Sequence, residues 1–427
     1  MSRVFKLLTA MALAALLLGG SVVLLSDPVE RVRAYTRQIE FDYVDWTLGA
    51  LWSKWQQLSV GSGEYVPVED QSQVVLDYLE LVRQIGAAQN EVARIYADPD
   101  IVDPEAASVD LRSQIEDLQA QRDQLGPLAE SVFQAQLSAV LAEMGISLGG
   151  QPVPPVLYHI TPPPNALIVS PRDAIRQDAN ISIDPDMTLD EITALEDQVA
   201  DNLDVSTLVV GIGGIGLYPT MVMQTTDLNW LAEVVAHEWV HNFLTLRPLG
   251  ASYLSSPELR TMNETVASIA GKEIGRQLVA TYYPELLPPE PEPEQDQGQQ
   301  PNPQETPAEP PAFDFRAEMH TTRLEVDRLL AEGKIPQAEA YMEVRRRMFW
   351  DQGYRLRKLN QAYFAFYGAY ADQPGGAAGV DPVGTAVRAL REQSASLTQF
   401  LNRVSWMWSF AQLQRAVAPA GEPDPAG

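Results

Sequence analysis

Residues 7–25 form an apolar run of 19 residues that contains no charged side chain. Arg3 and Lys6 precede the run, and Asp27 and Glu30 follow it. This length is close to the ~20 residues that cross a bilayer, and it exceeds the roughly 7–15 residues of a cleaved signal core. We therefore expect a signal anchor in the cell membrane, with the N-terminus cytoplasmic and the rest of the chain outside the cytoplasm. The alternative is a secreted protein whose signal peptide is cleaved.

Two later regions have the apolar periodicity of long helices. Apolar residues recur three and four positions apart over residues 74–97 and 109–144, with a break at residues 98–104. Aromatic side chains at helical spacing also predict an amphipathic helix within residues 36–60. We expect the two long helices to form a hairpin that braces the domain after them. A coiled coil with a partner is the alternative.

From residue 152 the pattern changes to short apolar runs separated by proline and glycine. Thr188, followed by acidic residues in the first turn, predicts the start of a helix over residues 189–203. The apolar runs predict strands at residues 156–160, 166–169, 207–212 and 217–224. Further helices are predicted at residues 316–332, 336–351, 356–370 and 381–407. The expected fold is α+β and predominantly helical.

These patterns divide the chain into six regions. Residues 284–311 are rich in Pro, Glu and Gln and contain seven acidic residues but no Lys or Arg, which is typical of a disordered linker. The expected regions are a membrane anchor (1–30), a helical stalk or hairpin (31–150), a catalytic domain (151–283), a disordered linker (284–312), a C-terminal helical subdomain (313–415) and a disordered tail (416–427).

Composition excludes several classes of function. The 30 Lys and Arg against 57 Asp and Glu give a net charge of −27, so nucleic acid is a poor partner. The chain has no cysteine, which excludes disulfides, thiol catalysis and cysteine-ligated metals. It has only four histidines, so a metal would be held by His and carboxylate groups.

A glycine-rich segment at residues 211–216 matches the G-x-G-x-x-G pattern of dinucleotide-binding loops. That function requires a helix to begin immediately after the glycines, so that its amides face the pyrophosphate. Pro219 and a strand-like sequence stand there instead. We therefore interpret the segment as a turn between two strands and expect no nucleotide.

His237, Glu238 and His241 form an H-E-x-x-H motif. Asp227 is a good N-cap upstream, and Arg247-Pro248 gives a stop, so the motif is expected on a helix. Positions i and i+4 lie on one helix face, where both imidazoles can bind one zinc ion. Glu238 is then the candidate base for the water at the metal.

A catalytic zinc requires a third protein ligand. Distant His159 and His320 are candidates, but a carboxylate on the next helix is closer in sequence. Glu264 and Glu273 lie nine residues apart on that helix, so only one of them can face the metal. Glu264 has apolar neighbours in mid-helix, where an unpaired carboxylate would be costly to bury, and we expect it to be the ligand.

The motif at residues 233–241, followed by Asn263-Glu264, resembles the gluzincin metallopeptidases, whose catalytic zinc is bound by two His and one Glu. The Asn263-Glu264-x-x-Ala267-Ser268 element is most similar to bacterial membrane-anchored proteins classed as aminopeptidases. The resemblance spans about 50 residues and implies a zincin-like core with a small sheet and an active-site helix. It departs from thermolysin-like enzymes at Ser268, where they have Asp, and it lacks the Gly-x-Met-Glu-Asn element of large aminopeptidases.

The resemblance implies a zinc-dependent peptidase anchored in the membrane and facing away from the cytoplasm, with a peptide or protein as substrate. Asn263 and Ser268 are expected to surround the zinc ligands, and the strand at residues 217–224 to pair with the substrate backbone. Candidate stabilisers of the transition state are His320, Arg357, Tyr363 and Tyr367. The alternatives are an inactive zincin-like binding or scaffold protein at the membrane, and a structural protein in which the motif is coincidental.

Overall fold

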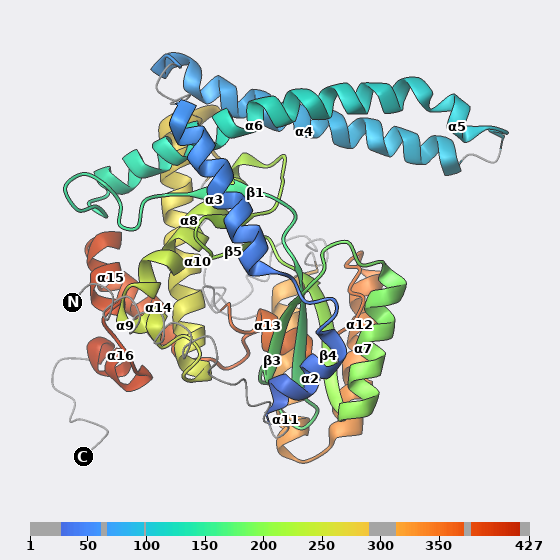
Figure 1. Ribbon diagram of the computed structural model, residues 1–427. Coiled ribbons are helices and arrows are strands. Elements are labelled where there is room, and N and C mark those ends of the chain that lie inside the picture. Colours follow the sequence, from blue (N-terminus) through green and yellow to red (C-terminus); the bar gives the residue numbers. More distant parts are fainter. Residues whose placement is uncertain (1–26, 61–65, 98–99, 290–312, 371–376, 419–427) are drawn as a thin grey trace, which may run out of the picture.

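The computed structural model describes residues 27–60, 66–97, 100–289, 313–370 and 377–418 (Figure 1). The fold is α+β and predominantly helical, as the sequence predicts. Its helices are α2 (Pro28–Thr36), α3 (Tyr43–Val60), α4 (Val68–Ala97), α5 (Pro104–Ala107), α6 (Val109–Glu143), α7 (Leu189–Leu203), α8 (Leu228–Thr245), α9 (Pro248–Ala251), α10 (Pro257–Tyr282), η2 (Pro284–Leu286), α11 (Phe315–Ala331), α12 (Ile335–Asp351), α13 (Gln361–Tyr367), α14 (Pro382–Glu392), α15 (Leu397–Val404) and α16 (Phe410–Val417). The strands are β1 (Tyr158–Ile160), β2 (Asn165–Pro171), β3 (Ala179–Ile183), β4 (Val205–Gly211), β5 (Gly214–Ile215) and β6 (Thr220–Val222).

The structure corrects the expected membrane anchor. Within the described ranges, no helix combines the length and the apolar character that crossing a bilayer requires. The longest of these helices, α4 and α6, carry charged residues along their length and pack their apolar stripes against protein. The predictions of a membrane-spanning helix, a membrane partner and a single-pass location are wrong on this finding. The run at residues 7–25, on which they were based, lies outside the described residues.

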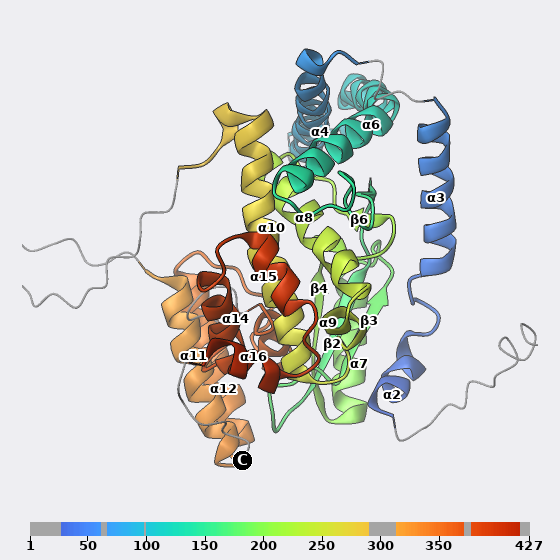
Figure 2. The same ribbon diagram turned by 90° about the vertical axis from the view of Figure 1, so that its left-hand side faces the viewer.

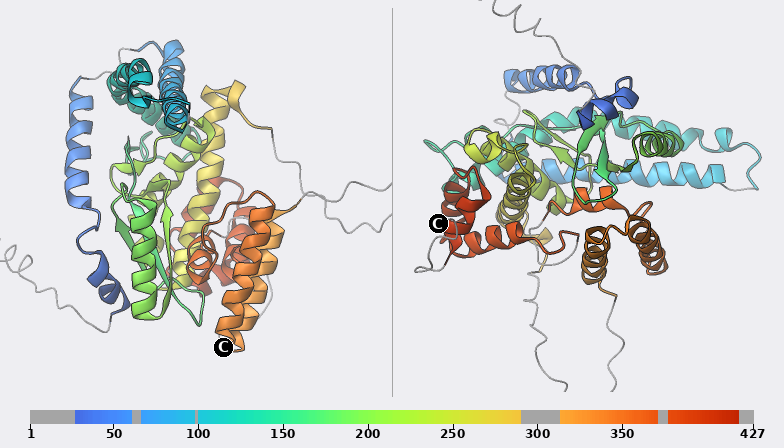
Figure 3. Two further views of the ribbon diagram at one scale, coloured as in Figure 1. Left: turned by 90° about the vertical axis from the view of Figure 1, so that its right-hand side faces the viewer. Right: turned by 90° about the horizontal axis from the view of Figure 1, so that it is seen from below.

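The larger sheet has the strand order β3-β2-β4, with both pairs antiparallel. Leu167 pairs with Ile181 on one side and with Val209 on the other. Alternate residues of β2 enter two different cores, because successive side chains point to opposite faces of a sheet. Helices α2 and α7 cover one face, and α11, α12 and α13 cover the other (Figure 3).

A second, smaller sheet has the order β1-β6-β5. Strand β6 is central, parallel to β1 and antiparallel to β5. It leads directly to α8, whose first turn is capped by Asp227. The edge of this sheet that borders α8 is therefore β5, not the predicted strand at residues 217–224.

The largest core surrounds α8 and α10, against which α4, α6 and the C-terminal helices α14–α16 pack (Figures 1 and 2). Two glycines on α10 allow the backbones of α8 and α10 to approach closely. A Cβ atom added at Gly271 would lie 2.9 Å from the Cα of His237, and one at Gly275 would lie 2.8 Å from the backbone nitrogen of Glu233. Both separations are too short for any other residue, so the glycines fix where α10 crosses α8.

Several elements differ from their prediction. The helix expected over residues 381–407 is divided into α14 and α15, because Ser396 caps a new helix start. The amphipathic region at residues 36–60 contributes to two helices, α2 and α3. Strand β3 was not predicted, since its alternation of apolar and polar residues is short and follows a turn-rich segment. The C-terminal helices also separate, with α11–α13 packing on the larger sheet and α14–α16 on α10.

We expect Gly275→Ala to lower the free energy of unfolding by about 1–3 kcal/mol, because α10 must move away from α8 to admit the methyl group. Gly86 of α4 is the matched control, since a Cβ there would meet no atom within 4 Å. Gly86→Ala should be stabilising by about 0.5–1 kcal/mol. Urea unfolding measures both changes. A Gly275→Ala variant as stable as the wild type would contradict the close crossing.

Candidate metal centre

Helices α8 and α10 present the residues of the motif to each other. Asp227 accepts hydrogen bonds from the amides of Asn229 and Trp230, so α8 begins where the sequence predicts. Ser256 caps α10, with Pro257 in its first turn. The close crossing at Gly271 then places the face of α10 that carries Glu264 and Gly271 against the histidines of α8.

His237, His241 and Glu264 lie together between the two helices. Their ligand atoms all lie within 4.8 Å of one another. The two Nε2 atoms are 3.1 Å apart, and Oε2 of Glu264 lies 3.8 Å from Nε2 of His237 and 3.5 Å from Nε2 of His241. Two imidazoles and one carboxylate are one of the ligand sets that hold catalytic zinc in proteins, so these three groups could hold a metal ion.

Neighbouring side chains orient the candidate ligands. The Nδ1 atom of His241 donates to Oδ1 of Asn263 at 2.7 Å, which directs the Nε2 atom at the cluster. The hydroxyl of Tyr253 donates to Oε1 of Glu264. The other oxygen, Oε2, is buried and has no hydrogen-bond partner among the described residues. A buried carboxylate oxygen without a donor is costly, and a bound cation would satisfy it.

The electrostatics of the cluster also fit a cation. Burial alone would raise the pKa of Glu264, but the two imidazoles outweigh it and lower that pKa to about 2. Burial and the neighbouring His241 lower the pKa of His237 to about 3. Burial opposes charge on His241 as well, yet the Glu264 carboxylate raises its pKa to about 9. The carboxylate of Glu264 thus favours positive charge at the imidazoles, and a metal ion held by the same three groups would supply that charge instead.

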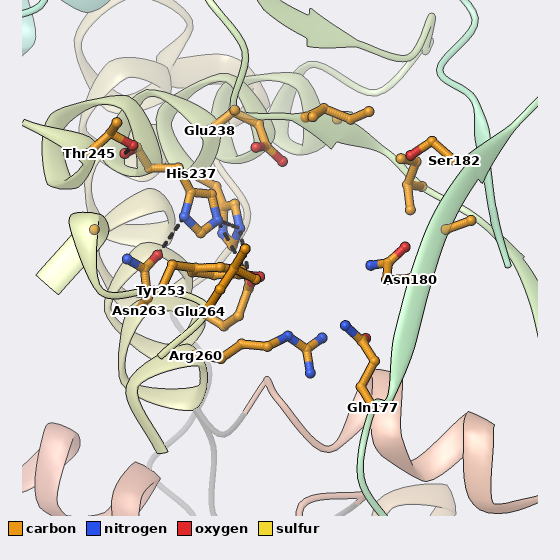
Figure 4. Close-up of a pocket in the computed structure, with 18 of the residues that line it drawn as sticks. Gln177, Asn180, Ser182, His237, Glu238, Thr245, Tyr253, Arg260, Asn263 and Glu264 are labelled. Atoms are coloured by element: carbon orange, nitrogen blue, oxygen red, sulfur yellow. Dashed lines mark hydrogen bonds and ion pairs between the residues drawn. The ribbon is translucent and has the colours of Figure 1, made fainter. Parts of the chain in front are cut away.

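Glu238 is largely buried and borders a cleft that the three candidate ligands also line. Burial, followed by the negative charge of Glu264, raises the pKa of Glu238 to about 7. Its carboxyl group can therefore both accept and release a proton near neutral pH. In Figure 4 the carboxyl group of Glu238 points into the open space beside His237.

The glycine-rich segment joins two strands, β4 and β5, as expected, and it has a second role in the structure. A Cβ at Gly214 would lie 2.9 Å from Cγ of Glu238, and one at Gly216 would lie 2.9 Å from Cβ of His241. The glycines let β5 lie directly against the motif face of α8. This segment lines the cleft as an edge strand, and no helix follows its glycines before α8.

The cleft has a volume of about 590 Å³ and two different walls. Helices α8 and α10, with Tyr253 from the loop between α9 and α10, form one wall. Gln177 and the outward-facing Asn180 and Ser182 of β3 form the other (Figure 4). The cleft thus runs between the candidate metal centre and the larger sheet.

The four predicted transition-state stabilisers do not line this cleft. Arg357 forms an ion pair with the fully buried Glu196 of α7, with a shortest separation of 2.5 Å. This ion pair joins the segment before α13 to α7. Tyr363 is buried in the core beneath the sheet, and the ring of Tyr367 contacts it at a tilt of 43°, with ring centroids 4.5 Å apart. His320 lies on α11, on the same side of the sheet.

Of the other predicted residues, Asn263 contacts the cluster, whereas Ser268 is buried on α10 and does not line the cleft. Glu273 pairs with Arg391 of α14 at 2.7 Å, away from the histidines. His159 also lies elsewhere, with Nδ1 3.0 Å from the buried Glu130.

Sequence reasoning missed two tyrosines at the centre. The ring of Tyr253 lies 6.4 Å from that of His241, and the ring of Tyr370 lies 6.3 Å from that of His237. The charge of Glu264, followed by burial, raises the pKa of Tyr370 well above its ordinary value, so its hydroxyl remains a donor. Neither residue has a fixed spacing from the motif, so the motif alone does not point to them.

Comparisons of the chain with models of protein families, with curated proteins and with solved structures found no match. The resemblance to gluzincins therefore stays a prediction from the motif. The class of protein has to be argued from the geometry of the cluster and its cleft.

The position of Arg357 predicts a structural effect. We expect Arg357→Met to lower the free energy of unfolding by about 2 kcal/mol at neutral pH, because Glu196 keeps only Lys358 as an ion-pair partner. Burial opposes the charge of Glu196, but hydrogen bonds from Arg357 and Lys358 lower its pKa below 4.5. The contribution of the ionised Glu196 carboxylate to the free energy of unfolding is therefore complete above about pH 4.5 and is lost at lower pH.

The difference in stability between wild type and Arg357→Met should accordingly shrink as the pH falls below 4.5. Urea unfolding at several pH values measures it. A variant of unchanged stability, or one whose deficit grows in acid, would contradict the structural role of this ion pair.

Proposed function

We propose that this protein is a zinc-dependent peptidase of the zincin type, with His237, His241 and Glu264 as metal ligands and Glu238 as the general base. The observation that carries the proposal is the convergence of these three ligand groups, in which the buried Oε2 of Glu264 has no hydrogen-bond partner in the described part of the chain and faces the two imidazoles. The adjoining cleft supports it, because the cleft gives a substrate access to Glu238. In this proposal α8, α10 and β5 form a zincin-like core, braced by the α4–α6 helical hairpin.

When bound, zinc supplies a Lewis acid that polarises the scissile carbonyl and promotes ionisation of water. Glu238 takes the proton of the attacking water on its carboxylate and delivers it to the leaving amine. Asn263 holds His241 in the tautomer that can bind the metal. Tyr253 already donates to Glu264, so we assign the donor for the developing oxyanion to the hydroxyl of Tyr370.

The edge strand β5 provides a place for the substrate backbone. Its outer edge borders the cleft beside Glu238, and the small sheet continues no further on that side. An extended peptide can hydrogen-bond to such an edge as an additional strand. Because Gly214 and Gly216 carry no side chains, this strand lies directly against Glu238 and His241, so a peptide paired to its edge would lie beside them.

We expect Glu238→Gln to retain about one zinc per chain while its hydrolysis of a peptide library falls by about 10²–10⁴-fold, because only the base is lost. Metal analysis and mass spectrometry of the digest measure the two effects. A chelator should abolish wild-type hydrolysis, and added zinc should restore it. Stoichiometric zinc without wild-type hydrolysis would instead favour a binding or scaffold protein, and no zinc at all would remove the metal centre.

We expect Asn263→Ala to weaken zinc affinity by about 10–100-fold, because His241 loses the acceptor that orients it. Glu264→Gln should weaken the affinity further, since it removes a ligand charge. Competition with a chromophoric chelator measures both. Asn229→Ala is the matched control on the outer face of α8, where Asn229 bonds to Leu286. Equal affinities for the Asn263 and Asn229 variants would contradict the role of Asn263.

A further inference from the structure

Arg260 is the cleft feature that the proposed chemistry does not use. It lies one turn before Glu264 on α10, so both side chains lie on the same helix face. Among the described residues that line the cleft, it is the only Lys or Arg. Its guanidinium group therefore places a permanent positive charge beside the candidate metal centre.

The guanidinium group has unused donors. Its Nη1 atom donates to the carbonyl of Ala365 at a long 3.4 Å, and a side-chain hydrogen bond joins the group to the Tyr253 hydroxyl, but its Nε atom is buried without a partner. Within the described ranges, no Asp or Glu comes into ion-pair distance of Arg260. A buried N–H without an acceptor costs free energy, which an incoming anionic group would recover.

The opposite wall offers complementary groups. Gln177 faces Arg260 across the cleft in Figure 4, and its Oε1 atom is also buried without a partner. Asn180 and Ser182 continue this wall along β3 with uncharged side chains. The far wall therefore provides hydrogen bonds and contributes no carboxylate that would repel an anion bound at Arg260.

We propose that Arg260 binds a carboxylate of the substrate, while Oε1 of Gln177 accepts a peptide N–H of the same substrate. This inference rests on the proposed peptidase function and specifies its substrate class. A carboxylate matches the planar fork of guanidinium N–H groups, and charge-assisted pairs of this kind are among the strongest hydrogen bonds in proteins. The carboxylate can be the C-terminus of a peptide or the side chain of Asp or Glu.

The test uses a mixed-sequence decapeptide library in four forms. The C-terminus is either a free acid or an amide, and Asp and Glu are either present or replaced by Asn and Gln. We expect the wild type to cleave carboxylate-bearing peptides with a kcat/KM about 10–100-fold above that of their uncharged counterparts. The pair of forms that shows the difference identifies the source, C-terminus or side chain.

Substitutions assign the preference to Arg260. Arg260→Gln should bring the ratio between charged and uncharged peptides close to one, and Arg260→Lys should keep part of it because Lys retains charge without the fork. Arg415→Gln is the matched control, on the exposed surface of α16, and should keep the wild-type ratio. The wild-type ratio and the Lys variant remain informative if Arg260→Gln does not fold.

Equal rates on all four forms by an active wild type would overturn the inference and leave the peptidase function standing. An equal loss of kcat on every form in Arg260→Gln would also overturn it, since Arg260 would then act on the transition state. Binding is tested separately with Glu238→Gln protein by calorimetry on the four forms. Carboxylate-dependent binding that Arg260→Gln removes would support the inference even if the wild type hydrolysed nothing, in which case only the peptidase function fails.

Discussion

The close crossing of α8 and α10 is the constraint on which the candidate metal centre depends. Gly271 and Gly275 bring the α10 backbone to within van der Waals contact of α8 at Glu233 and His237. Only at this separation can a carboxylate on α10 reach two imidazoles on α8, because a glutamate side chain spans only a few ångströms. Burial of apolar side chains in the largest core of the described residues holds the two helices at this distance, because both are buried there along most of their length.

The sequence predicts best what is determined locally. The H-E-x-x-H motif, the Asp227 and Ser256 caps and the start of α7 at Thr188 each depend on contacts within a few residues, and the structure has all of them at the predicted positions. Glu264 was selected because an isolated buried carboxylate needs a partner, an argument that requires no three-dimensional information. The residues of the cluster could therefore be named from the sequence, whereas their convergence depends on the crossing of α8 and α10.

Tertiary context determines what the sequence could not predict. Arg357, Tyr363 and Tyr367 have the chemistry of catalytic side chains, but their positions depend on how α13 packs against the larger sheet, and that packing directs them away from the cleft. The glycine-rich segment matched a loop pattern, whereas its glycines are needed for contact between β5 and α8. Tyr253 and Tyr370 reach the centre from segments that have no fixed spacing from the motif.

The two walls of the cleft belong to separately packed parts of the protein. One wall is built on the core around α8 and α10, and the other is built on the larger sheet, which has cores of its own on both faces. The gap between Glu264 and Asn180 is consequently set by how these two bodies dock. Mutations far from the cleft, at the junction between the bodies, thus act on the width of the cleft.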